Sequence, residues 1–241
     1  RFSYSNAKAV LRAVNGGISA DNLASSVLPD ENDLNIGWIE IARQSETLED
    51  AAAAMRGTPW GSAINEMDAD ARLQEYEDNL DRHYYREAIT ELRASGLGHS
   101  LLLGYLRKEI DHRNIVNMLR ALRQDLPVEQ RLDAMLDGGS VLKGSLLKSA
   151  AEADSQDALM EVLRRSNMDT TELEEKLDES NEHGGFDPVV SYLAEERRSD
   201  MRRMSHLNPL SAFPIIYYLE SKVIEVQNLR LLVRGKAVGL P

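Results

Sequence analysis

The 241-residue sequence has no cysteine, few aromatic residues and no long hydrophobic run. Without cysteine it can form no disulfide, thiolate nucleophile or cysteine-ligated zinc site. Aromatic side chains make up only 5% of the residues, which argues against a β-sandwich and against an aromatic-lined sugar or base site. The densest apolar run, PLSAFPIIYYL at 209–219, is shorter than the ~20 residues of a membrane span and contains two prolines. We therefore expect no direct insertion into a membrane.

The sequence has fewer basic than acidic residues, 28 Lys and Arg against 40 Asp and Glu, which gives a formal net charge of −12. A nucleic-acid partner is not expected, because binding to phosphates requires a basic surface. Only seven of the basic residues are Lys. Many carboxylates with few Lys are typical of a halophilic protein, because high salt screens the repulsion between like charges. An acidic surface that binds a basic partner would explain the same composition, so both explanations stay open.

Recognisable motifs for catalysis or cofactor binding are also lacking. The segments GGSVLKGS at 138–145 and RGKAVG at 234–239 contain Gly and Lys without the spacing of a phosphate-binding loop. The five histidines are not paired at a metal-ligand spacing, so each is expected at the surface or in a turn. Acidic residues are so frequent that adjacent carboxylates indicate no acid–base function. We expect no catalytic, cofactor-binding or metal-binding residues; an enzyme with an unrecognised carboxylate site is a remaining alternative.

Three similar helical segments each place an Arg six residues after their first Asn. This motif appears as NAKAVLRAVNGG from Asn6, NIVNMLRALRQDLP from Asn114 and NLRLLVRGKAVGLP from Asn228. An acid precedes two of these Asn residues by three positions, Asp111 and Glu225, where the first copy has Ser3. SETLEDAAAAMRGT at 45–58 also aligns with ADSQDALMEVLRRSN from 153.

These spacings predict repeated helical domains of about 110 residues. The tail of a first repeat would occupy 1–16, a second domain 17–125 and a third domain 126–241. The alternative is that amphipathic helices simply resemble one another. Because the sequence starts without Met and close to the first motif, we expect a fragment of a longer protein.

Helical periodicity predicts an all-α fold. After the second motif Asn, the apolar residues Ile115, Met118, Leu119 and Leu122 follow the stripe of a 3.6-residue helix. Asp169 or Thr170 is expected to cap one helix. Asn208 is expected to cap another, unless that helix starts at Ser211 with Pro214 in its first turn. Helix ends are expected at Gly16-Gly17, Pro127, Gly138-Gly139, Gly184-Gly185, Gly235 and Gly239.

The repeated motif supplies the candidate site residues. They are Asn6, Arg12, Asn114, Arg120, Asn228, Arg230 and Arg234. In a structural interpretation, each Asn hydrogen-bonds a neighbouring helix or turn and each Arg pairs with a carboxylate or a helix C-terminus. In a functional interpretation, three equivalent polar groups line a shared axis that receives a partner.

The C-terminal segment NPLSAFPIIYYLESKVIEVQNLRLLVRGKAVGLP, at 208–241, resembles the C-type subunit of the archaeal and V-type rotary ATPases, the counterpart of the d-type subunit of the eukaryotic vacuolar enzyme. YLRKEIDHRNIVNMLRALR at 105–123 and EDAAAAMRGTPWG at 49–61 are also similar to this family. The resemblance rests chiefly on Pro209, Tyr218-Leu219, Glu225, Asn228-Leu229-Arg230, Arg234-Gly235-Lys236 and Gly239-Leu240-Pro241.

The resemblance implies three similar helical domains that form a pseudo-threefold funnel in the intact protein, with about two of them in this chain. It implies a non-catalytic central-stalk subunit of an A/V-type ATP synthase, with no cofactor. The implied partners are the D- and F-type stalk subunits and the membrane proteolipid ring, and the implied role is to transmit rotation during ATP synthesis and ion transport. The implied location is peripheral, at the cytoplasmic face of the cell membrane. A general helical scaffold or adaptor with repeated domains is the alternative function.

Overall fold

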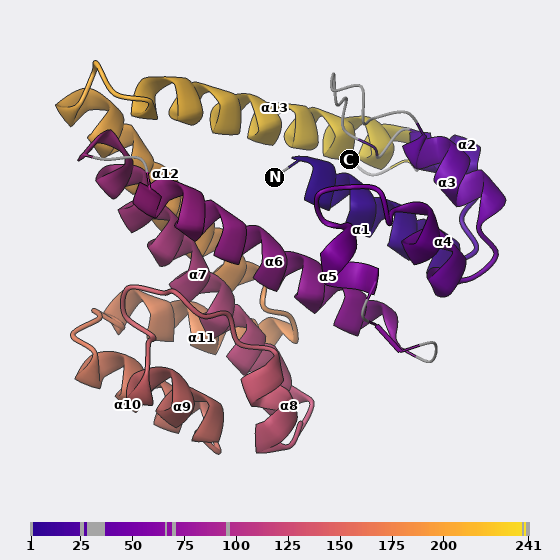
Figure 1. The fold of residues 1–241 in the computed structure, drawn as a ribbon. Coiled ribbons are helices and arrows are strands. Elements are labelled where there is room, and N and C mark those ends of the chain that lie inside the picture. The colour runs from indigo at the N-terminus through magenta and orange to yellow at the C-terminus, as the bar shows by residue number, and fades with distance from the viewer. Residues whose placement is uncertain are drawn as a thin grey trace. The chain divides into compact units, whose positions relative to one another are not determined.

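The computed structural model describes residues 2–24, 27, 37–65, 67–68, 71–94, 97–237 and 239. The regular structure of these residues is helical throughout, which confirms the expected all-α fold (Figure 1). The helices are α1 (Phe2–Asn15), α2 (Ala20–Ala24), α3 (Trp38–Gln44), α4 (Leu48–Ala54), α5 (Gly61–Asn65), α6 (Leu73–Ala94), α7 (Leu97–Arg123), α8 (Val128–Asp133), α9 (Ser145–Glu152), α10 (Gln156–Arg165), α11 (Thr171–His183), α12 (Asp187–Leu207) and α13 (Phe213–Ala237). Within the ranges just given, no helix is both long enough and apolar enough to span a bilayer.

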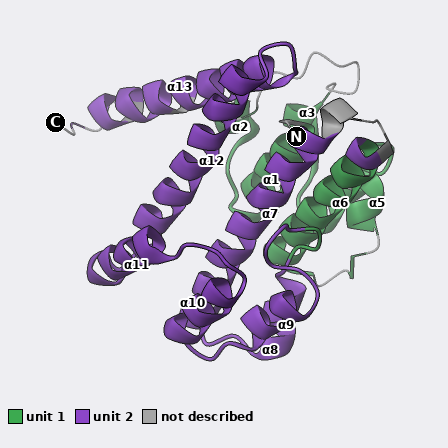
Figure 2. Ribbon diagram, turned by 90° about the vertical axis from the view of Figure 1, so that its left-hand side faces the viewer, with its two compact units in different colours: residues 1–91, 136–138 green, residues 92–135, 139–241 purple. Residues whose placement is uncertain are grey.

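The chain divides into two compact units, shown in different colours in Figure 2. Unit 1 comprises residues 1–91 and 136–138, and unit 2 comprises residues 92–135 and 139–241. Each unit contains its own hydrophobic core.

The core of unit 1 is built around α1. Val10 and Leu11 are fully buried, and α1 packs against α2, α3 and α4. The rings of Trp38 and Trp60 stack in this core with their centroids 5.5 Å apart. Leu80 of α6 completes it. The apolar stripe of α1 is therefore enclosed by the helices that follow it in sequence.

The core of unit 2 is built around the C-terminal half of α7. Ile115, Met118 and Leu119 are at most 1% exposed, as the helical periodicity predicts. They belong to a cluster with residues of α9, α10, α11 and α12, including Ala150, Leu159, Leu163, Leu173 and Val189. This half of α7 thus contributes buried side chains to the core of unit 2, as α1 does to the core of unit 1.

The aligned segments at 45–58 and from 153 both form a helix that begins with a hydroxyl cap. Thr47 accepts a hydrogen bond from the Asp50 N–H and forms a capping box with it, while Ser155 accepts one from the Ala158 N–H at 3.1 Å. The two capped helices, α4 and α10, begin 108 residues apart, as do α2 and α8. The repeat itself stays a prediction, and this register favours it.

Two expected helix boundaries are wrong. Asn208 does not start α13: it is the C-cap of α12, where its main-chain N–H and its side-chain amide both donate to the Met204 carbonyl. The helix begins at Phe213 with Pro214 in its first turn, close to the alternative start. Gly235 does not stop α13, which continues to Ala237, because a single Gly within a helix costs only about 1 kcal/mol.

Candidate functional site

The first two motif asparagines are buried, and the third is exposed. Asn6 is 1% exposed in unit 1 and Asn114 is fully buried in unit 2. Asn228, on α13, is exposed to solvent. These two amides are therefore buried, and whether each of them hydrogen-bonds a neighbouring helix or turn stays a prediction. The third copy has the same local sequence pattern in a different environment.

The cations of the first motif pair with two acids that lie one turn apart on α6. Arg12 donates to both carboxylate oxygens of Glu77, at 2.5 and 2.7 Å, and these hydrogen bonds raise the pKa of Arg12. Lys8 lies 2.5 Å from the Asp81 carboxylate. Two cations spaced four residues apart on α1 therefore match two acids spaced four residues apart on α6.

The second motif copy is anchored differently. Val116 replaces the first cation, and Arg120 is exposed. Arg123 instead lies over the Phe186 ring, 3.6 Å from its centroid, and donates to the Gly184 carbonyl. Asn117 donates to the Ala134 carbonyl at 2.9 Å.

The third motif copy completes the placement of the candidate residues. Arg230 is half-buried on α13, whereas the side chain of Arg234 lies outside the described part of the structure. Asn6 and Arg12 belong to unit 1, and Asn114, Arg120, Asn228 and Arg230 belong to unit 2.

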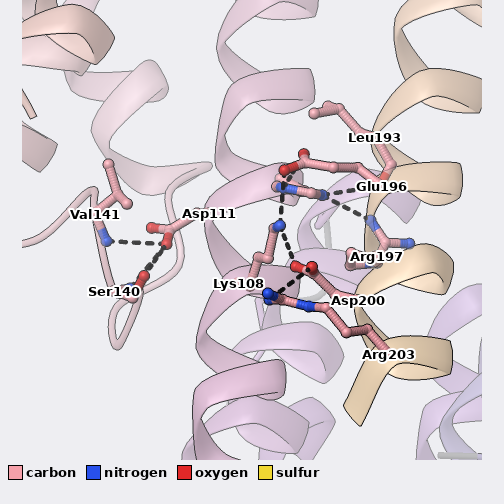
Figure 3. Close-up of polar contacts among 10 residues, drawn as sticks. Lys108, Asp111, Ser140, Val141, Leu193, Glu196, Arg197, Asp200 and Arg203 are labelled. Carbon is pink, nitrogen blue, oxygen red and sulfur yellow. Dashed lines mark hydrogen bonds and ion pairs between the residues drawn. The ribbon is translucent and has the colours of Figure 1, made fainter. Parts of the chain in front are cut away.

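Asp111, three residues before Asn114, holds the loop that precedes α9. Asp111 is 2% exposed, and its carboxylate accepts hydrogen bonds from the main-chain N–H groups of Ser140 and Val141 at 2.8 and 2.9 Å (Figure 3). The main-chain N–H of Leu142 donates to the same carboxylate at 2.9 Å. The Ser140 hydroxyl donates to it as well, at 3.0 Å. A Cβ at Gly139 would lie 2.2 Å from Asp111 Oδ1, so this close approach requires glycine. We call this arrangement the Asp111 clasp.

A second polar cluster ties α7 to α12 (Figure 3). Lys108 Nζ lies 2.7 Å from Glu196 Oε1 and also pairs with Asp200, one turn further along α12. Burial opposes the charge on Lys108, but the hydrogen bonds with Asp200 and Glu196 outweigh it and raise the lysine pKa. His112, four residues after Lys108 on the same face of α7, lies 3.2 Å from Glu196 Oε2. The contact with His112, followed by that with Lys108, lowers the pKa of Glu196 to about 2.

Two histidines expected at the surface are buried. His112 is 2% exposed, and its Nδ1 lies 3.0 Å from the Leu193 carbonyl. His83 is 8% exposed, with its ring nitrogens 2.7 Å from the Tyr4 hydroxyl and 3.1 Å from the Ser62 hydroxyl. The expectation is wrong because hydrogen-bonding neighbours compensate the loss of water at both ring nitrogens. Burial lowers the pKa of His83.

The α7–α12 cluster was not predicted from the sequence, although one signal for it exists. Lys108 and His112 are spaced four residues apart, and so are Glu196 and Asp200. Two such pairs of opposite charge indicate two helix faces that can meet. Nothing local shows which acidic pair faces which basic pair, in a chain so rich in acids. Among the residues that the structure describes, no group of three or more His, Cys, Asp or Glu is arranged to hold a metal ion.

The chain belongs to the family described as the ATP synthase (C/AC39) subunit, whose profile matches residues 1–241. The C-type subunit of the A-type ATP synthase of Archaeoglobus fulgidus is 27% identical over 194 residues, which are 80% of this chain and 54% of that protein. The corresponding protein of Methanococcoides burtonii is 24% identical over all of this chain and 66% of that protein, and the one of Haloquadratum walsbyi is 26% identical over all of this chain and 69% of that protein. The chain thus spans between about half and two thirds of the length of these relatives.

Proposed function

We propose that the chain is a non-catalytic central-stalk subunit of an A/V-type rotary ATP synthase. In this role it links the D- and F-type stalk subunits to the membrane proteolipid ring and transmits rotation during ATP synthesis and ion transport. Its position would be peripheral, at the cytoplasmic face of the membrane. The observation that carries the proposal is the family match, which extends over residues 1–241. The relatives are named as C-type subunits of A-type ATP synthases.

The polar contacts of unit 2 fit a subunit that transmits torque. A rotor element must resist sliding of its helices, and apolar contacts alone are non-directional. Lys108 and His112 meet Glu196 and Asp200 at defined positions along α7 and α12. The Asp111 clasp fixes a loop to the same helix. Such contacts favour one register of α7 against its neighbours.

The net charge of −12 is compatible both with adaptation to high salt and with binding to basic partner subunits. Relatives in Haloquadratum walsbyi and Haloferax volcanii support the halophilic explanation, because in high salt a surface with excess acidic charge carries little self-repulsion. An acidic surface would also attract basic ends of stalk subunits or basic loops of the ring.

A tagged chain tests the proposal in cells of the source organism. After detergent extraction of the membranes, we expect the chain to retain the other rotary ATP synthase subunits in fixed ratio through washes in high salt. A tagged chain with Asp111→Ala, which weakens unit 2, is the control for an incompletely folded bait and should retain fewer of these subunits. Recovery of the folded chain without any ATP synthase subunit would contradict the proposal and favour a general helical scaffold.

A further inference from the structure

The turn that joins α12 to α13 presents large apolar side chains to solvent. Figure 1 shows this turn at the end of α12 that lies away from α11. Leu207, the last residue of α12, is 67% exposed, and Leu210, in the turn, is fully exposed. Ile215 and Tyr218, in the first two turns of α13, are 65% and 59% exposed. We call these four side chains the corner residues. Because Leu210 protrudes so completely, the corner is convex and offers no groove.

The turn is held by its own hydrogen bonds, so it fixes the exposed side chains in place. Asn208 caps the end of α12, and the Ser211 hydroxyl donates to the Asn208 carbonyl at 2.6 Å. The Phe213 N–H donates in turn to the Ser211 hydroxyl at 3.2 Å. The Phe213 side chain is 1% exposed, whereas Leu210, three residues earlier, lies in water. Apolar side chains gathered in this way on an ordered surface mark an interaction site.

The corner is also basic, although the chain as a whole is acidic. Residues 201–219 contain Arg202, Arg203 and no Asp or Glu, in a chain with a net charge of −12. Arg202 and His206, one turn apart on α12, are exposed, and among the described residues neither has a hydrogen-bond or ion-pair partner. Arg203 lies 3.4 Å from Asp200, and its side chain remains 65% exposed. Cationic and apolar side chains therefore adjoin at the end of α12.

We propose that this corner binds a lipid surface with negatively charged headgroups. Arg202 and Arg203 bind lipid phosphates, because such a surface attracts clustered Lys and Arg side chains. The corner residues enter the boundary between headgroups and acyl chains, where leucine and tyrosine side chains are favourable. The contact is shallow, since no helix among the described residues is suited to span a bilayer. It goes beyond the proposed function, in which the contact at the membrane is with the proteolipid ring.

Two features favour a lipid surface over an acidic partner protein. A partner helix needs an apolar groove to receive it, whereas this corner protrudes, and a soft lipid surface accepts separate side chains without a matching pocket. The charge distribution indicates the same occupant. The acidic remainder of the chain is repelled by an anionic bilayer, so the corner is the part that can approach it, and the subunit is held on the surface in one orientation.

Flotation with lipid vesicles tests the proposal. The subunit, at the length at which the source cells make it, is mixed with vesicles at a moderate KCl concentration, and the bound fraction is measured after flotation. The vesicles contain phosphatidylcholine alone, or equal parts of phosphatidylcholine and phosphatidylglycerol. We expect binding to the anionic vesicles, and binding at least about tenfold weaker to the neutral ones, because the two Arg side chains lose their attraction to the surface.

A charge reversal locates the basic part of the contact. The double variant Arg202→Glu, Arg203→Glu should bind the anionic vesicles at least about tenfold more weakly than the unchanged subunit. The double variant Arg56→Glu, Arg120→Glu, at two exposed positions elsewhere, is the matched control, because it changes the net charge by the same amount. It should bind far more strongly than the first double variant.

An apolar substitution locates the other part of the contact. Leu210→Ser should weaken binding to the anionic vesicles several-fold, whereas Ile18→Ser, at an exposed apolar position of unit 1, should not. Thermal melts followed by circular dichroism check that every variant is folded.

Two results would overturn the proposal. One is the absence of binding to either kind of vesicle, and the other is binding that the variants at Arg202, Arg203 and Leu210 leave unchanged. If vesicle binding is absent and the same variants lose an acidic ATP synthase subunit in the tagged-chain recovery, the corner binds an acidic protein, which also overturns the proposal. Because the vesicles contain no protein, the flotation result can be read even if the proposed function fails.

Discussion

Removal of the Asp111 carboxylate should destabilise unit 2 and leave unit 1 unchanged. In Asp111→Ala, three main-chain N–H groups and one hydroxyl lose their acceptor. A hydrogen bond to a charged group contributes ~1.5–3 kcal/mol to stability. Ser140 is exposed and Val141 is half-buried, so their N–H groups can regain water, whereas Leu142 is fully buried. We therefore expect a loss of about 3 kcal/mol in the free energy of unfolding, less than the sum of the separate bonds.

The positions of the two tryptophans make this loss measurable for each unit. Trp38 and Trp60 both belong to unit 1, so tryptophan fluorescence follows that unit during urea unfolding, while far-ultraviolet circular dichroism follows both. Asp111→Ala should lower the urea midpoint seen by circular dichroism for unit 2 and leave the fluorescence midpoint unchanged. Asp178→Ala, at an exposed carboxylate of α11, is the control and should change neither.

A double-mutant cycle with Gly139 tests the geometry of the clasp. The Cβ of Gly139→Ala would lie 2.2 Å from Asp111 Oδ1 and 2.9 Å from the Leu142 carbonyl oxygen. Asp111→Ala removes the first of these obstacles, so the double variant should be more stable than the sum of the two single effects by about 1 kcal/mol or more. Additive effects, or a loss below about 0.5 kcal/mol for Asp111→Ala, would refute this account of the clasp.

Three further predictions concern the motif, the α7–α12 cluster and the acidic composition. Asn114→Leu should lower the free energy of unfolding by about 1–3 kcal/mol, because an apolar side chain cannot replace the hydrogen bonds of a fully buried amide. Asn228→Leu, at an exposed position, should have almost no effect. Equal melting temperatures of the two variants would contradict this prediction. The pKa of Glu196 is lowered from its ordinary value of 4.5 to about 2 in the folded protein. The ionised carboxylate therefore stabilises the fold fully above pH 4.5, and this stabilisation is lost as the pH falls through about 2. Glu196→Gln should thus lower the free energy of unfolding by about 1–2 kcal/mol at neutral pH, a value reduced because the Glu196 side chain is partly exposed, and by almost nothing near pH 2. If urea unfolding gives the same difference between the variant and the unchanged protein at both pH values, the prediction is refuted. If the acidic excess is a salt adaptation, thermal unfolding midpoints should rise steeply from low to molar KCl, and a flat dependence would favour the basic-partner explanation.

The parts of the fold that follow local rules could be predicted from the sequence. The apolar spacing of Ile115, Met118 and Leu119 predicts their burial, since one helix face must meet a core. The caps of α4 and α10 follow from Thr47 and Ser155 in the same way. Helix ends were less predictable at Gly235, where helix continuation outweighs the small cost of glycine.

Features that depend on partners distant in sequence could not be predicted. Asp111 binds a loop about thirty residues away, and Lys108 pairs with acids about ninety residues away on α12. The four-residue spacing of Lys108 and His112 is a local signal, but it does not show which of the many acids in the chain they face. Asn114 and Asn228 show the same limit, because equivalent motif positions are buried in α7 and exposed in α13. Whether the candidate motif residues also line a partner-binding axis stays a prediction.

The most direct test of the central-stalk role is reconstitution with the two stalk subunits of the same source. The subunit, at the length at which the source cells make it, is mixed with the D- and F-type subunits in high salt. The mass of the resulting complex is then measured by light scattering. A stable complex with one copy of each subunit is the expected result. If the three folded proteins elute separately at every salt concentration, the proposed link between the stalk and this subunit is contradicted.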